Sequence, residues 1–191
     1  SGDDDTLKFS SVRTVDGVWN TPQGSLVNGR WYHVAVTYDS SDIANDPLLY
    51  INAVSQTVSE QVTPVGAQVS NTGTGYFGNN AAGTRALDGK TTHVALFDRI
   101  LSPNEIRQLM NIPGSVTRGL VGYYPLNGNP IEPDFSGNQR NGTLNGGVSV
   151  STLSPPVSGR FVIPCYMNWY ASAVPETPVS ALDESFVFSG W

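Results

Sequence analysis

Residues 31–38 read WYHVAVTY. The apolar side chains in this stretch recur at every second position, which is typical of a β-strand with two distinct faces. Further short strands are predicted over residues 48–52, 53–62 and 91–97, separated by polar loops and an Asp-Gly turn. The chain also contains 20 glycines and 13 prolines, and only 14% of its residues are charged. These features predict an all-β protein of many short strands joined by tight turns.

One segment carries the signals of a helix. Ser102 is a suitable N-cap, Pro103 occupies the first helical position, and Glu105 lies three residues after the cap. This arrangement is a capping box, and Ile106 and Leu109 supply an apolar face behind it. A single short helix is therefore predicted near residues 102–111.

The charge and the composition exclude several classes of function. The net charge is −6 and no two basic residues are adjacent, so phosphate backbones find no basic patch and nucleic acid is not expected as a partner. No stretch approaches the roughly 20 apolar residues that a membrane-spanning helix needs. Cys165 is the single cysteine, which excludes a disulfide within the chain.

Three parts of the sequence together carry a resemblance to a known family. They are residues 28–39 with 49–52, residues 77–89 with 94–106, and residues 119–128 with 134–144. The sequence resembles the laminin-G-like branch of the concanavalin A-like lectin/glucanase domains. The resemblance implies an antiparallel β-sandwich of the jelly-roll type.

The order of these parts is unusual for that family. Residues 1–112 resemble the closing half of a jelly roll, and residues 113–191 resemble an opening half, with a boundary between residues 112 and 118. Because half a sandwich exposes strand edges and an apolar face, each half needs a complement. Either the two halves close one permuted sandwich, with residues 119–126 against residues 31–38 or 87–98, or they pair with neighbouring chains.

The resemblance also implies a possible calcium site in the loop after the opening strand. Asp134 and Asn138 match that loop by position, and calcium prefers such oxygen ligands. Thr92 and His93 stand where the family tends to carry acidic residues, which removes negative charge from the site. The alternative is that Asp134 holds an Asx-turn and binds no metal. Calcium is the one cofactor that the sequence suggests.

Several other residues are candidates for binding or modification. Aromatic side chains in irregular segments can stack on sugar rings, although they can equally fill the core. The candidates of this kind are Trp19, Tyr76, Trp169 and Tyr170. Asn141 begins an Asn-Gly-Thr triplet, which fits the N-glycosylation pattern. His33 is expected to pack in the sheet.

The sequence gives no indication of catalysis. No Ser/His/Asp set is evident, and no strand carries the alternating carboxylates by which the related glucanases act. We therefore expect a non-catalytic, extracellular adhesion module that binds glycans or surface proteins. The alternative is a structural subunit of a surface filament or virion, which assembles with neighbouring copies of itself by strand complementation.

Overall fold

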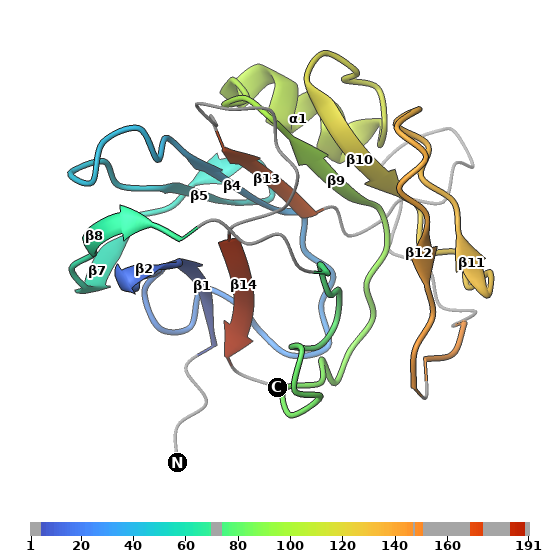
Figure 1. Cartoon of the computed structure of the whole chain (residues 1–191), viewed down its shortest axis with the longest axis horizontal. Helices are drawn as coiled ribbons and strands as arrows, with labels where there is room; N and C mark the ends of the chain where they lie inside the picture. Colours follow the sequence, from blue (N-terminus) through green and yellow to red (C-terminus); the bar gives the residue numbers. More distant parts are fainter. Residues whose placement is uncertain (1–4, 70–73, 147, 151–168, 174–183, 190–191) are drawn as a thin grey trace.

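A computed structural model describes residues 5–69, 74–146, 148–150, 169–173 and 184–189, the last two segments as main chain only. The described part consists mostly of strands in antiparallel sheets, with one short helix (Figure 1). The predicted all-β sandwich is thereby confirmed.

The larger sheet has six strands. In spatial order these are β10 (Leu120–Tyr124), β9 (Val94–Phe97), β13 (Trp169–Ala173), β4 (Val34–Tyr38), β5 (Leu48–Ile51) and β6 (Val54–Ser55). The strand β13 runs parallel to both of its neighbours, whereas every other described pair of strands is antiparallel.

The smaller sheet has four strands and faces part of the larger one. Its spatial order is β14 (Glu184–Ser189), β1 (Thr6–Ser11), β3 (Gly17–Asn20) and β7 (Ser59–Val62). Two further short ladders join β2 (Arg13–Val15) to β8 (Val65–Gln68), and β11 (Ile131–Glu132) to β12 (Gly142–Thr143). In Figure 1 the β11–β12 hairpin lies beside β10, at the end of the larger sheet away from β5.

The main core lies between the two sheets. Phe9 and Trp19 of the smaller sheet pack against Tyr38 of the larger one, with ring centroids 5.3–5.9 Å apart. The alternation predicted for residues 31–38 is confirmed, because Val34 and Val36 belong to this core together with Tyr38. Ala35 faces the other side of the sheet, where the helix packs.

The helix α1 (Pro103–Asn111) covers that second face of the larger sheet. Its buried residues Ile106 and Leu109 pack against Phe97 and Ala95 of β9. The predicted capping box is present, since Ser102 and Glu105 exchange hydrogen bonds between side chain and main chain. Glu105 also forms a two-point ion pair with Arg99, which ties the start of the helix to the end of β9.

Three predicted strands are shorter than expected, for local reasons. Residues 31–38 form a strand only from Val34, because the His33 N–H donates to the side-chain oxygen of Asn52 and not to a main-chain carbonyl. The predicted strand 53–62 is two strands, because the chain passes from β6 in one sheet to β7 in the other. β9 begins at Val94, since His93 has a left-handed φ of 52° and donates its N–H to Pro125.

The strand β10 lies beyond the predicted boundary at residues 112–118 and pairs with β9 of the same chain. The register joins Leu120 to Phe97 and Tyr124 to Val94. The expected contact between residues 119–126 and 87–98 is therefore present within one molecule. The division into a closing half and an opening half stays a prediction.

Candidate functional site

The long loop between β8 and β9 carries exposed aromatic side chains. Tyr76 is 51% exposed and Phe77 is 43% exposed. Neighbouring exposed apolar side chains can mark an interaction site, so this loop is a candidate ligand site. Tyr76 was predicted as a ligand residue, whereas Phe77 was missed.

Hydrogen bonds within the loop hold its conformation. Leu87 donates its main-chain N–H to the carbonyl oxygen of Gly78 at 2.7 Å. The side chains of Asn79 and Asn80 accept N–H groups from Arg85 and Thr84, at 3.0 and 2.9 Å. The loop is therefore closed on itself, as in a compact Ω-loop, and presents its aromatic residues from a fixed base.

Phe77 rests on the larger sheet through Tyr124 of β10. The two rings are 5.4 Å apart at an angle of 50°. Tyr124 is 7% exposed and clusters with Val94 and Leu96 of β9. Because successive side chains of a strand point to opposite faces, Val94 and Leu96 lie opposite the helix-covered Ala95 and Phe97. Phe77 thus lies on the face of the sheet that α1 does not cover.

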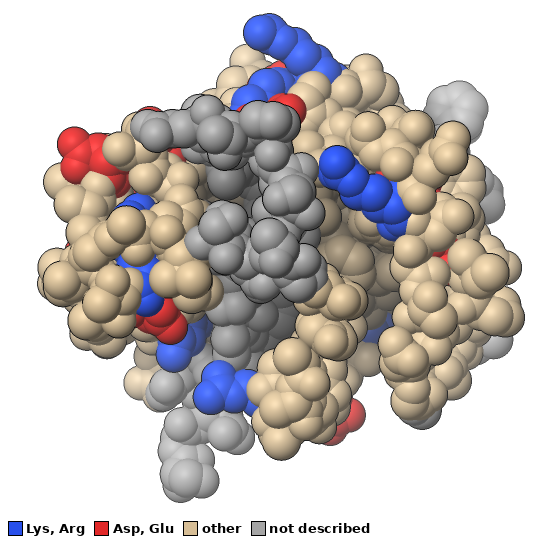
Figure 2. Space-filling view, in the orientation of Figure 1, with Lys and Arg blue, Asp and Glu red and all other residues tan. Residues whose placement is uncertain are grey.

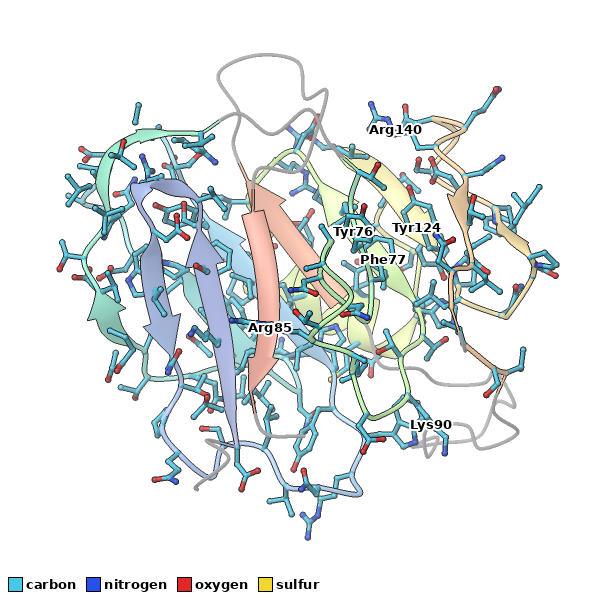
Figure 3. The ribbon with its side chains drawn as sticks, turned by 60° about the horizontal axis from the view of Figure 1, so that its bottom comes forward. Tyr76, Phe77, Arg85, Lys90, Tyr124 and Arg140 are labelled. Carbon is cyan, nitrogen blue, oxygen red and sulfur yellow. The ribbon has the colours of Figure 1, made fainter. Side chains whose placement is uncertain are left out.

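Three basic side chains lie in the loops near this aromatic group, with Lys90 the farthest of them in Figure 3. Figure 3 shows Tyr76, Phe77 and Tyr124 together, with Arg140 beyond Tyr124 on one side, Lys90 on the opposite side and Arg85 on a third. We call these six residues the aromatic–basic surface. Arg85 and Lys90 are exposed, and among the described residues the only ion pair joins Arg99 to Glu105.

The face of the molecule drawn in Figure 2 carries little charge. In the view of Figure 2, acidic and basic side chains are sparse and most of the described surface is neither. The described loop residues 74–92 contain two basic residues and a single acidic one, Asp88, in a chain whose net charge is −6. This loop therefore carries one more basic than acidic side chain in a chain with an acidic total.

The loop after β10 supports Arg140 through Asp134. The Asp134 carboxylate accepts main-chain N–H groups from Tyr123, Ser136 and Arg140, and the Ser136 hydroxyl, at 2.9–3.1 Å. Burial alone raises the pKa of Asp134, but these hydrogen bonds outweigh it and the pKa lies below its usual value. Tyr124 completes the arrangement by donating its hydroxyl to the carbonyl oxygen of Arg140 at 2.7 Å.

These contacts do not fit a calcium site. Calcium needs six to eight oxygen atoms with free lone pairs, whereas N–H and O–H donors already occupy the Asp134 carboxylate. Asn138 directs its amide nitrogen, a donor, at the carbonyl oxygens of Leu120 and Val121. The Asx-turn reading of Asp134 is the one that the contacts support. Within the described residues, no three His, Cys, Asp or Glu side chains form a group that could hold a metal ion.

Replacing Asp134 is expected to destabilise the loop with or without calcium. Asp134→Ala leaves three main-chain N–H groups without their acceptor, at a cost of about 2 kcal/mol in the free energy of unfolding. The measurement is urea unfolding in calcium and in chelator, with Asp88→Ala as the control for loss of one exposed carboxylate. A free energy of unfolding of the unmodified chain that falls on chelation would contradict this account.

Trp19, predicted as an exposed stacking residue, is a core residue. It is 1% exposed, packs between Phe9 and Tyr38, and donates its indole N–H to Asp46 at 2.8 Å. The prediction was wrong because the strand β3 is only four residues long, too short for its alternation to show in the sequence. The alternative, that this residue fills the core, is correct.

The remaining candidates lie in two different settings. Trp169 and Tyr170 were predicted in an irregular segment, but they belong to the central strand β13, and their side chains lie outside the described part. Asn141 is exposed at the start of the β11–β12 hairpin's second strand, and its side-chain oxygen accepts the N–H of Asp134 at 3.0 Å. Its glycosylation stays a prediction.

Two histidines and one glutamate are buried. Burial lowers the pKa of His33 to about 3 and that of His93 to about 4, so both are neutral at physiological pH. His93 also lies 2.6 Å from the Tyr123 hydroxyl through Nδ1. Glu132, which the sequence did not single out, is 3% exposed and accepts the N–H of Leu126, a residue with a left-handed φ of 57°. All three are therefore buried inside the fold and are not candidates for a ligand site.

Comparison with known proteins identifies the family. A laminin-G-like family model, described as the concanavalin A-like lectin/glucanases superfamily, matches residues 2–107, which is more than half of the chain. No curated protein and no solved structure gives a match. In the described residues no helix has the length and apolar character to cross a bilayer. With its antiparallel sheets and single short helix, the chain belongs to the concanavalin A-like lectin/glucanase superfamily, in its laminin-G-like branch.

Proposed function

We propose that the chain is a non-catalytic, extracellular binding module whose aromatic–basic surface holds a glycan with acidic groups. The observation that carries this proposal is the pair of exposed rings, Tyr76 and Phe77, of which Phe77 packs on Tyr124, with basic side chains in the neighbouring loops. Aromatic rings stack on the apolar faces of sugars, and the loop that holds them is closed by its own hydrogen bonds.

The basic residues decide the class of glycan. Arg85 and Lys90 are exposed and have no ion pair with a described carboxylate, so their charges are available to a ligand. Arg140 uses one N–H group on the carbonyl oxygen of Val121 and is otherwise exposed. An arginine fork suits carboxylate and sulfate groups, which favours uronic acid or sulfated sugars over neutral ones.

Removing the two rings is expected to weaken binding to such a glycan. A stacked ring contributes about 0.5–1.5 kcal/mol, so Tyr76→Ala with Phe77→Ala is expected to lower the affinity roughly tenfold or more. The measurement is affinity electrophoresis or calorimetry with a polyuronate, beside a neutral glucan. Arg107→Gln is a matched control, since Arg107 lies on α1, which covers the opposite face of the sheet.

The contribution of the basic side chains to the affinity can be measured separately, through its dependence on salt. Arg85→Gln with Lys90→Gln is expected to reduce both the affinity for polyuronate and its dependence on salt, because exposed charges are screened at high ionic strength. The affinity for the neutral glucan should be unaffected by these two changes. An unmodified chain that binds neither acidic nor neutral polysaccharides would contradict the proposed function.

A further inference from the structure

The larger sheet contains an opening that the family-matched part of the chain does not fill. β4 and β9 both lie within residues 2–107, yet they do not pair with each other. β13 lies between them and pairs with both, joining Tyr170 to Ala35 on one side and to Ala95 on the other. Every residue of β4 and β9 is buried. Without β13, two buried strands would face an opening with their main-chain hydrogen-bonding groups unsatisfied.

The same C-terminal part of the chain also covers the smaller sheet. β14 pairs along the whole of β1, from Thr6 opposite Ser189 to Ser11 opposite Glu184. β13 and β14 thus complete both sheets of the sandwich. In the described residues they pair with strands from β1 to β9 and with none from β10 to β12.

This mode of attachment does not depend on which copy of the chain supplies the strands. Main-chain pairing fixes the register but does not distinguish a chain's own strand from the identical strand of a neighbour. Eighteen residues, 151–168, separate Val150 from β13. An extended stretch of that length spans up to about 60 Å, which is enough to reach a second molecule.

We infer that β13 and β14 are donor strands, which can complete the sandwich of a second copy of this chain. In the exchanged form, β13 of one copy enters the opening between β4 and β9 of the other, and β14 covers its β1. The exchange is independent of the aromatic–basic surface, so glycan binding and assembly can fail separately.

Disulfide trapping across β1 and β14 tests the exchange. Lys8 lies opposite Val187 in an antiparallel pair, and such pairs have Cα separations that a disulfide can bridge. One chain carries Lys8→Cys and a second carries Val187→Cys, both with Cys165→Ser to remove the native thiol. The two chains are unfolded together, refolded at a series of concentrations and oxidised. The expected result is a mixed disulfide dimer whose yield rises with protein concentration.

The Lys8 and Val187 positions also provide the control and the outcomes that would overturn the inference. Replacing the Lys8→Cys chain by an Arg107→Cys chain should give no mixed dimer, because Arg107 lies on α1, away from β14. The inference is overturned if a chain with both cysteines closes its own disulfide while mixtures of the single variants stay monomeric at every concentration. It is equally overturned if neither arrangement cross-links, since β14 then does not pair with β1 in solution.

Discussion

A chain shortened by residues 169–191 is expected to lose cooperative folding. The truncation removes β13 from the middle of the larger sheet and β14 from the edge of the smaller one. The loss of β13 is the more damaging, because β4 and β9 are buried along their whole length and each would lose a hydrogen-bonded neighbour.

The size of the loss in the free energy of unfolding depends on the main-chain pairs that the truncation removes. β13 makes five register pairs with β4 and four with β9. Each hydrogen bond contributes about 1 kcal/mol, and a buried group left unpaired costs more, whereas small domains are stable by only about 5–15 kcal/mol. The loss is therefore comparable with the whole free energy of unfolding. Urea unfolding followed by circular dichroism should show no sigmoidal transition for the shortened chain.

Supplying residues 169–191 as a separate peptide provides the control. The peptide is expected to restore a cooperative transition, with a midpoint that rises with peptide concentration because it binds only the folded state. A shortened chain that is monomeric and unfolds cooperatively without the peptide would contradict this expectation, since β4 and β9 would then have closed on each other.

Acidification is expected to destabilise the chain well before its carboxylates are protonated. Burial lowers the pKa of His33 to about 3, whereas a histidine in the unfolded chain titrates near 6.5. Because the folded state binds fewer protons, the stabilising contribution is fully present above pH 6.5 and is lost as the pH falls from 6.5 towards 3. The free energy of unfolding then falls by about 1.4 kcal/mol for each pH unit in that window. His93 acts in the same direction down to about pH 4.

Unfolding in urea at pH 7, 6 and 5 measures this slope. His33→Gln removes one titrating group but keeps the main-chain bonds between His33 and Asn52, so its stability should fall more gently with acidification. His93→Gln is the matched variant for the second histidine. A His33→Gln chain with the same slope as the unmodified chain would show that His33 is protonated without cost in the folded state.

The elements that the sequence predicts best are those with their own local signals. The helix at residues 103–111 follows from a capping box and an apolar face that lie within eight residues of each other. The strand at residues 34–38 follows from strict alternation, and its two faces are indeed buried against different neighbours. Both predictions depend only on residues close together in the chain.

The features that escaped prediction depend on contacts far along the chain. The insertion of β13 beside β4 joins residues more than 130 positions apart, in a parallel orientation that no local pattern encodes. The burial of Glu132 could not be predicted because β11 has only two residues, which is too short for periodicity to show. Its hydrogen bond to the N–H of Leu126 forms only in the folded chain. Phe77 was missed because its importance arises from the ring of Tyr124, which only the fold brings near.

In the loop of residues 76–87, the residues that fix its shape are different from the exposed aromatic residues at its start. Asn79 and Asn80 clasp the backbone, whereas Tyr76 and Phe77 project from the start of the loop and make none of the clasping bonds. Substitutions at the two aromatic positions would therefore change the surface that we propose to bind glycan while the hydrogen bonds of Asn79 and Asn80 are preserved. The chain offers a scaffold on which specificity can diversify, or be engineered, without redesign of the sheets below.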